Sequence, residues 1–525
     1  MQFNLIDEQW IPVKRRDGAS DMIAPWEVTD KFSENPVVAL NAPRPDFNGA
    51  LIQFLIGLVQ TTAAPANRVE WKEKLRTPPA KSEIKQKFET VRHAFELDGV
   101  GPRFMQDLER NGGKEWGVSC LLLDSPGDNT LENNQDHFVK RGRVNVLCPA
   151  CAATALFTLQ TNAPYGGVGH QSSIRGGGPV TTLVLPQRNE IGSLWETIWI
   201  NTLENQSFLN FCGNPDKPGD ENKFAWLVPT RKSGKDKGIE TTPEHVHPAH
   251  MFWSFSRRIV LNGVNLDSVM CDLCGLPTIY GFKNYKALTF GTSYTGSWLH
   301  PLSPHRRLNQ QSFPRKVQPG GITYRHWLGL VQEDRRTLSE PALVVHRFRE
   351  NPPESDGTYR LWAFGYDTDP KRPTKARCWY EGQMPLIQVN PSVRNDYEQS
   401  VASIVRAASE IASNTRSAVK KAWFKRPGDV KGDMYFLDSS FWNHTEETFY
   451  EALGTLKSAY ESGRNGFEAC STWHKILTDE SLRLFDLHAW NGPIEDADPK
   501  RIVIHRKELN KFNHAKKIKE LLGLP

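Results

Sequence analysis

Residues 148–179 read CPACAATALFTLQTNAPYGGVGHQSSIRGGGP, and they contain the two features that decide how this chain folds and what it does. The stretch opens on Cys148 and Cys151, a pair of cysteines separated by two residues. It closes on a run of glycines that begins at Gly166 and ends at Gly178. A candidate metal site and a candidate ligand-binding loop therefore follow one another within one short stretch.

The cysteine pair has a counterpart far along the chain, at Cys271 and Cys274. A tight C-x-x-C turn presents two thiolates to one ion, and two such turns complete a tetrahedral four-cysteine zinc site. Four thiolates leave no position for water, so we expect a structural zinc that joins two distant loops. The alternatives are a set of buried thiols or a redox pair. The other cysteines are isolated and predicted to be inert: Cys120, Cys212, Cys378 and Cys470.

The glycine run offers backbone that a ligand can approach closely. Glycine is required where a side chain would block such an approach or where φ is positive. The segment could therefore enter a minor groove, or hold a phosphate together with Arg175. It lacks the lysine of a P-loop and the spacing of a dinucleotide-binding loop. The alternative is a tight structural turn. The candidate contact residues are Tyr165, Gly166, Gly167, Val168 and Gly169.

Clusters of basic residues suggest contacts with nucleic acid. Phe138, Lys140 and Arg141 stand together just before the first cysteine pair, and an aromatic among cations suits backbone contact and base stacking. Lys420, Lys421 and Lys425 form a second cluster in the C-terminal region. The alternative for each is a solvated surface. Several such patches together could form one path for a nucleic-acid backbone.

Composition narrows the class of protein. The 525 residues carry a formal charge of only +5, which is too small to identify a nucleic-acid binder by itself. Hydrophobic residues make up 38% and charged residues 24%, as in soluble globular proteins. The longest apolar stretch, residues 50–59, is too short to span a membrane, and the first residues do not resemble a signal peptide. We expect a reduced cytoplasmic protein with no membrane contact.

The pattern of residues predicts an α+β fold. We expect two short strands around residues 7–9, a helix that begins at Asp46, and a second helix over residues 82–97. Apolar runs at 342–345 and 359–364 predict strands. After residue 390 apolar residues recur at helical spacing in four segments. The prediction is a large mixed α/β domain with the zinc site at 1–390, followed by a C-terminal four-helix bundle at 391–525.

No catalytic motif accompanies these features, and we expect a protein that is not an enzyme. Zinc-protease, serine-hydrolase and nucleotide-deaminase signatures are all missing from the sequence. Two other functions stay open at this point. One is a stand-alone, zinc-stabilised RNA-binding protein; the other is a hydrolase whose site is dispersed along the chain.

Several segments resemble the CasA family, the large subunit of the type I-E CRISPR Cascade complex. The similarity lies in residues 4–13 (NLIDEQWIPV), 148–157 (CPACAATALF), 160–182, 298–304 (WLHPLSP) and 364–367 (FGYD), with KARCW at 375–379. They occur in family order, and the helical tail agrees with the family's C-terminal bundle. The resemblance therefore covers essentially the whole chain.

The resemblance implies a non-catalytic subunit that recognises the protospacer-adjacent motif (PAM) of duplex DNA from the minor groove. It helps to open the duplex so that guide RNA can pair, which forms an R-loop. The implied partners are guide RNA, target duplex DNA, the backbone, small and handle-binding subunits of Cascade, and a helicase–nuclease that the complex recruits for antiviral defence.

The resemblance also implies roles for individual residues. Tyr165 to Gly169 would approach the PAM, with Gly167 at the centre. Counting from Cys274 places a second PAM contact near Thr289, and we take Lys286 as the candidate. Lys375 would lie at the tip of a wedge that unstacks the duplex. Phe138, with Lys140 and Arg141, would bind the guide RNA, and Lys420, Lys421 and Lys425 the DNA backbone.

Overall fold

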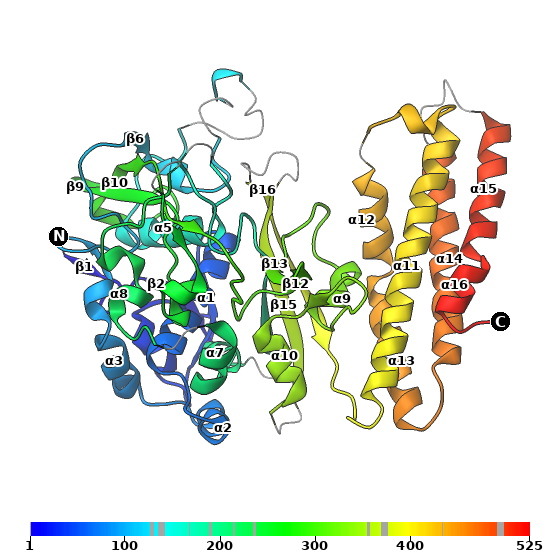
Figure 1. Ribbon diagram of the computed structural model, residues 1–525, viewed down its shortest axis with the longest axis horizontal. Coiled ribbons are helices and arrows are strands. Elements are labelled where there is room, and N and C mark those ends of the chain that lie inside the picture. Colours follow the sequence, from blue (N-terminus) through cyan, green and yellow to red (C-terminus); the bar gives the residue numbers. More distant parts are fainter. Residues whose placement is uncertain are drawn as a thin grey trace. The chain divides into compact units, whose positions relative to one another are not determined.

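The computed structural model describes residues 2–126, 131–134, 142–166, 169–187, 192–213, 216–234, 238–353, 357–368, 376–432, 434–490 and 498–525 (Figure 1). The chain forms two compact units. The N-terminal unit comprises Met1–Val317 and Ala342–Glu381, and the C-terminal unit comprises Gln318–Pro341 and Gly382–Pro525. Both helices and sheets are present, so the predicted α+β class is confirmed.

The N-terminal unit combines small, mostly antiparallel sheets with helices. Its helices are α1 (Pro45–Thr62), α2 (Arg68–Arg76), α3 (Lys81–Glu89), α5 (Pro149–Asn162), α6 (Leu194–Ile200), α7 (Asn205–Cys212), α8 (Asp220–Lys223) and α10 (Leu343–Glu350). Three sheets have three strands each: β3 (Ser20–Ile23), β2 (Ile11–Arg15) and β4 (Val37–Leu40); β6 (Lys114–Gly117), β10 (Pro277–Leu288) and β9 (Arg258–Met270); β16 (Ala376–Leu386), β15 (Thr358–Thr368) and β7 (Thr181–Gln187). Shorter strands are β1 (Phe3–Asn4), β5 (Glu96–Asp98), β8 (Glu240–Thr241), β11 (Ser293–Tyr294), β12 (His305–Leu308) and β13 (Gln311–Pro314).

Aromatic rings fill the centre of this unit. Phe54 of α1 meets five other rings edge-on, with centroids 5.4 to 6.0 Å away: Trp10, Phe95, Phe104, Phe157 and Trp253. Edge-to-face contacts of this kind stabilise a core beyond the burial of their area. Residues on every face of α1 are buried, as in a helix that is enclosed by its own domain.

Helix α5 connects the two features with which the sequence analysis began. Cys148 lies directly before its first turn, and Pro149 occupies the first helical position, where proline costs no hydrogen bond. Its far end, at Asn162, leads directly into the glycine run. Most of its residues are buried, Phe157 among the rings around Phe54. The core therefore fixes the positions of both candidate sites.

The C-terminal unit is mainly helical. Its helices are α9 (Trp327–Leu330), α11 (Arg394–Trp423), α12 (Tyr435–His444), α13 (Glu446–Glu461), α14 (Phe467–Trp490), α15 (Pro499–Asn513) and α16 (Lys516–Leu521), and β14 covers Ser339–Glu340. Figure 1 shows α11 lying alongside α13, α14 and α15. Helix α12 was not predicted, and the last predicted helix is two helices, α15 and α16. The four-helix detail is therefore not confirmed. Among the described residues, no helix is long and apolar enough to cross a membrane.

Three local predictions were wrong. The run at 342–345 is not a strand but the start of α10, because a short apolar run suits a buried helix equally well. The helix expected over 82–97 ends at Glu89, and β5 follows. Helix α1 begins after Arg44 rather than at Asp46. The Asp46 carboxylate lies in the first turn and accepts a hydrogen bond from the hydroxyl of Tyr366 at 2.6 Å.

Buried histidines are expected to make the stability of the N-terminal unit depend on pH. Burial lowers the pKa of His250 to about 3 and that of His305 to about 4, so both are neutral in the folded protein. In the unfolded chain each takes up a proton near pH 6.5. Below pH 6.5 the unfolded state therefore binds more protons, and stability decreases towards pH 4.

We expect the free energy of unfolding to decrease by about 2 kcal/mol per buried histidine at pH 5. Thermal melting at pH 7 and pH 5 measures this loss. His305→Gln should reduce the loss, since a glutamine amide can replace the imidazole donor to the carbonyl of Trp298. His346→Gln, at an exposed site on α10, should leave it unchanged. An equal melting temperature at both pH values would contradict the prediction.

Candidate metal centre and nucleic-acid interface

The four cysteines of the two C-x-x-C pairs come together in the structure. Cys148 and Cys151 lie at the beginning of α5, and Cys271 and Cys274 lie in the turn between β9 and β10. Gly275 follows in the left-handed conformation (φ 70°), which lets the chain reverse directly after the second pair. The turn is held to the residues before α5, because the Asp272 carboxylate accepts hydrogen bonds from the backbone N–H groups of Asn145 and Val146.

The geometry of the cluster suits a tetrahedral metal ion. All four Sγ atoms lie within 4.8 Å of one another, and the Sγ atoms of Cys148 and Cys274 are 3.8 Å apart. Zn–S bonds of about 2.3 Å at tetrahedral angles place two sulfurs about 3.8 Å apart. The four cysteines could therefore hold a metal ion, and the distances fit a closed structural zinc site.

The electrostatics of the cluster favour thiolates on the second pair. Hydrogen bonds with Cys148 and Cys151 lower the pKa of Cys274 to about 7, and hydrogen bonds with the other three thiols, Cys148 first, lower that of Cys271 below its usual range. The pKa of Cys148 and of Cys151 is raised. Because metal binding requires thiolates and releases their protons, occupancy of the cluster should depend on pH.

The described ends of the glycine loop pack tightly against two other segments. The N–H of Gly166 donates to the carbonyl of His170 at 2.9 Å, which closes the loop on itself. Gly169 has a φ of 80°, and a Cβ there would lie 2.8 Å from the backbone nitrogen of Phe290. Glycine is thus required at 169 for both conformation and space. Tyr165 is exposed, with 42% of its surface accessible.

The segment after the second cysteine pair adjoins this loop, as the sequence analysis expected. Thr289, which follows β10, lies against Gly169, where an added Cβ would be 2.8 Å from the threonine Cβ. Lys286 lies earlier on β10, opposite Glu115 of β6 and Val260 of β9, and it is half-buried. The structure therefore brings Thr289 into contact with the loop.

Other predicted site residues fall outside the described part of the chain. These are Gly167, Val168, Phe138, Lys140, Arg141 and Lys375. Their expected roles stay predictions.

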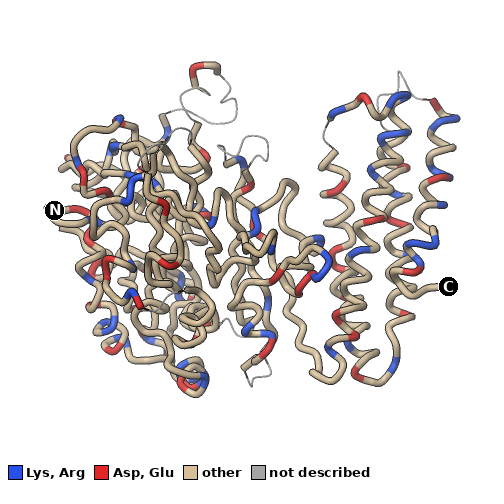
Figure 2. The backbone as a smooth tube through the Cα atoms, in the orientation of Figure 1, with Lys and Arg blue, Asp and Glu red and all other residues tan. Residues whose placement is uncertain are grey.

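The predicted backbone contacts of the C-terminal unit lie near the end of α11. The amine of Lys420 donates to the carbonyl of Val430 at 2.7 Å, and that of Lys421 lies 5.9 Å from the centre of the Phe512 ring. Lys425 is exposed, just beyond the helix. Figure 2 shows basic residues gathered at this end of the helices. Two of the three lysines therefore already have partners within their own unit.

Sequence reasoning missed two residues at the glycine loop, Gln160 and Arg257. The amide of Gln160 binds the backbone of residues 256 and 257, and the guanidinium of Arg257 lies beneath Gly166. The adjacent basic pair Arg257–Arg258 was the available signal, but nothing in the sequence says that it folds under a loop almost ninety residues earlier.

Comparison with known proteins identifies the family. The family model described as CRISPR-associated protein Cse1 matches residues 4–484, which is most of the chain. The chain belongs to the Cse1 family. The resemblance to CasA is thereby confirmed, because one solved relative carries both names, "Structure of Thermus thermophilus CasA (Cse1)".

Solved structures share the fold of this Cse1 family member from end to end. Thermus thermophilus CasA (Cse1) has 16% identity and a TM-score of 0.64, with 99% of each chain covered. Thermobifida fusca Cse1 has 16% identity and a TM-score of 0.67, covering 99% of this chain and 98% of that one. A chain of a "CRISPR RNA-guided surveillance complex" has 15% identity and a TM-score of 0.68, covering 98% and 100%. At such low identity these similarities show the fold alone.

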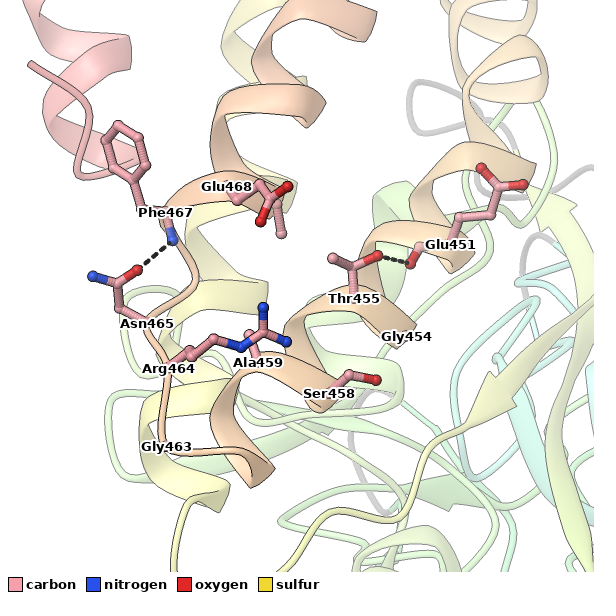
Figure 3. A pocket seen from close by; sticks show the side chains of 11 residues that line it. Glu451, Gly454, Thr455, Ser458, Ala459, Gly463, Arg464, Asn465, Phe467 and Glu468 are labelled. Atoms are coloured by element: carbon pink, nitrogen blue, oxygen red, sulfur yellow. Dashed lines mark hydrogen bonds between the residues drawn. The ribbon is translucent and has the colours of Figure 1, made fainter.

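The C-terminal unit of this chain also has a pocket that contains none of the predicted site residues. It has a volume of about 850 Å³ and lies where α13 ends and α14 begins (Figure 3). Glu451, Arg464 and Glu468 contribute charges of both signs. The Asn465 amide oxygen accepts from the backbone N–H of Phe467, which is the usual way to begin a helix. The pocket is thus a polar feature of the helix connection, and it carries no catalytic group arrangement.

Proposed function

We propose that this chain is the non-catalytic large subunit of a type I-E CRISPR Cascade complex. The observation that carries the proposal is the match to the Cse1 family over residues 4–484. The fold shared with a chain of an RNA-guided surveillance complex supports it. The proposed partners are guide RNA, target duplex DNA, the backbone, small and handle-binding Cascade subunits, and a helicase–nuclease that cleaves the DNA in the cytoplasm.

Within the complex, we propose that the glycine loop recognises the PAM from the minor groove. The loop comprises Tyr165 to Gly169, and Gly167 makes the closest backbone approach because any side chain there would obstruct it. The minor groove carries a degenerate pattern of donors and acceptors, so several PAM sequences should be accepted. The contact between Gly169 and Thr289 supports a composite site, to which Lys286 contributes positive charge.

The remaining predicted residues complete the mechanism. Lys375 would act at a wedge that separates the strands beside the PAM, which would start the R-loop. Phe138 stacks on an unpaired base of the guide RNA, and Lys140 and Arg141 bind its backbone. Lys425 binds the displaced DNA backbone, together with Lys420 and Lys421 if these release their present partners.

We also propose that the metal ion is zinc, held by Cys148, Cys151, Cys271 and Cys274. The zinc would join the β9–β10 turn to the beginning of α5, and it would supply no catalytic chemistry because four thiolates leave no open position. Since β10 leads into Thr289 and α5 leads into the glycine loop, the metal would fix both segments of the PAM site from their far ends.

A gel shift tests the function directly. Guide-loaded complex is assembled with and without this chain, and its binding to a matched duplex with a randomised PAM is compared with binding to the same target as single-stranded DNA. We expect duplex binding to need this chain and to select particular PAMs, while single-strand binding survives without it. If omission changes neither, the proposal is wrong. Tight RNA binding by the isolated chain would then favour a stand-alone RNA-binding protein.

A further inference from the structure

Arg257 is a basic side chain beneath the glycine loop. Its Nη2 donates a hydrogen bond to the carbonyl of Pro164, the residue directly before Tyr165. A Cβ added to Gly166 would lie only 2.3 Å from Nη1. Gly166 is exposed, and Arg257 itself is partly exposed.

The backbone at Arg257 is fixed from two sides. The amide oxygen of Gln160 accepts from the N–H groups of Ser256 and Arg257, and the amide nitrogen donates to the Arg257 carbonyl at 2.7 Å. On the other side, a Cβ at Gly291 would lie 1.9 Å from the Ser256 carbonyl oxygen. A side chain on such a backbone is held in place before any ligand arrives, which reduces the entropic cost of binding.

The charge of Arg257 is not balanced within the described chain. Among the described residues, no carboxylate lies within ion-pair distance of its guanidinium, and its buried Nε has no hydrogen-bond partner. Its neighbour Arg258 has the usual arrangement, pairing with Asp107 at 2.6 Å and with Glu109 at 2.7 Å. Burial lowers the pKa of Arg257 to about 10, so the group is still charged at neutral pH. A guanidinium with a buried donor that has no hydrogen-bond partner raises the free energy of the folded state unless an anion binds to it.

We propose that Arg257 binds a backbone phosphate of the target duplex when the glycine loop meets the DNA. The inference rests on the proposed function. A planar guanidinium can donate two parallel hydrogen bonds to a phosphate, and such contacts fix the position of a protein on DNA without reading its sequence. Arg257 would thus set the depth and register of the loop. Because Gly166 has no side chain, it leaves room for Nη1 beside the loop, which gives that position a role separate from the one proposed for Gly167.

The experiment uses the guide-loaded complex with Arg257→Met or Arg257→Lys. Arg110→Met is the matched control, because Arg110 also donates hydrogen bonds to backbone carbonyls, those of Val100 and Gly101. We expect Arg257→Met to weaken duplex binding about 10-fold at every PAM, and to reduce the slope of log K against log salt by about 1. Arg257→Lys should retain part of the affinity, and Arg110→Met should match the wild type.

Duplexes with a single methylphosphonate linkage, placed in turn across the PAM and its flanks, locate the phosphate. The wild-type complex should lose about 10-fold at one linkage, and Arg257→Met should show no further loss there. An identical methylphosphonate profile in both proteins would overturn the proposal, as would a changed order of PAM preference. If Arg257→Met fails to fold, the same comparison with Arg257→Lys decides the question. Wild-type binding that ignores the PAM would instead refute the proposed function.

Discussion

Cys148→Ser should prevent the N-terminal unit from folding. A structural zinc site contributes about 10 kcal/mol or more to folding, and a whole domain is stable by only about 5–15 kcal/mol. Cys148 also caps the first turn of α5, where its Sγ accepts a hydrogen bond from the N–H of Cys151. The substitution therefore removes a proposed metal ligand at the beginning of a core helix.

Elemental analysis and thermal melting measure this effect. The wild-type protein should carry about one zinc ion per chain, and chelation should lower its melting temperature. Cys148→Ser should be insoluble, or soluble without zinc and without a cooperative transition. Cys378→Ser is the matched control, because Cys378 is exposed and lies outside the cluster. Pure, soluble wild-type protein without any metal would show that the four cysteines are only buried thiols.

Gly167→Asp should abolish binding of the guide-loaded complex to PAM-containing duplex while the protein remains folded. The substitution adds bulk where we propose the closest backbone approach to the groove. It also places a negative charge against a surface lined by phosphates, so attraction becomes repulsion. We expect a loss of at least about 100-fold in affinity for duplex, with little change for a single-stranded target, which needs no PAM.

The control for this substitution is Gly101→Asp. Gly101 belongs to the same unit, and a Cβ added there meets no atom within 4 Å. It carries the same change of charge, so a general electrostatic effect would appear in both variants. Equal losses in the two variants, or undiminished binding with Gly167→Asp, would remove the glycine loop from the PAM site. Thermal melting of both variants confirms that the fold is retained.

The cysteine cluster shows how much one local pattern can predict. A C-x-x-C turn brings two thiols together through its own short backbone, whatever surrounds it, so Cys148, Cys151, Cys271 and Cys274 could be selected from the sequence. The strand at 359–364 and the long helix after residue 390 were predicted for the same reason, because the spacing of apolar residues along each short segment is sufficient to indicate its secondary structure. The family resemblance, too, rested on such continuous segments.

The sequence predicts less where a segment's state depends on a distant partner. The run at 342–345 becomes part of α10 because Val344, Val345 and Phe348 are buried on one helical face. Strand β1 was expected from its residues, but it pairs with β5, some ninety residues later. The sequence shows Lys420 and Lys421 only as basic residues. In the fold, the amine of Lys420 donates a hydrogen bond to a carbonyl, and the amine of Lys421 lies over an aromatic ring.

The glycine loop shows most clearly what the sequence alone predicts and what only the tertiary structure reveals. The sequence by itself predicted that the loop uses glycine for close approach or positive φ, and that it follows a candidate metal-binding C-x-x-C pair in the chain. Only the tertiary structure decided that Gly169 packs on Thr289 and that Arg257 lies beneath Gly166. The physical reason is range: backbone conformation and C-x-x-C geometry are set by neighbouring residues, whereas packing and charge balance depend on side chains that only folding brings together.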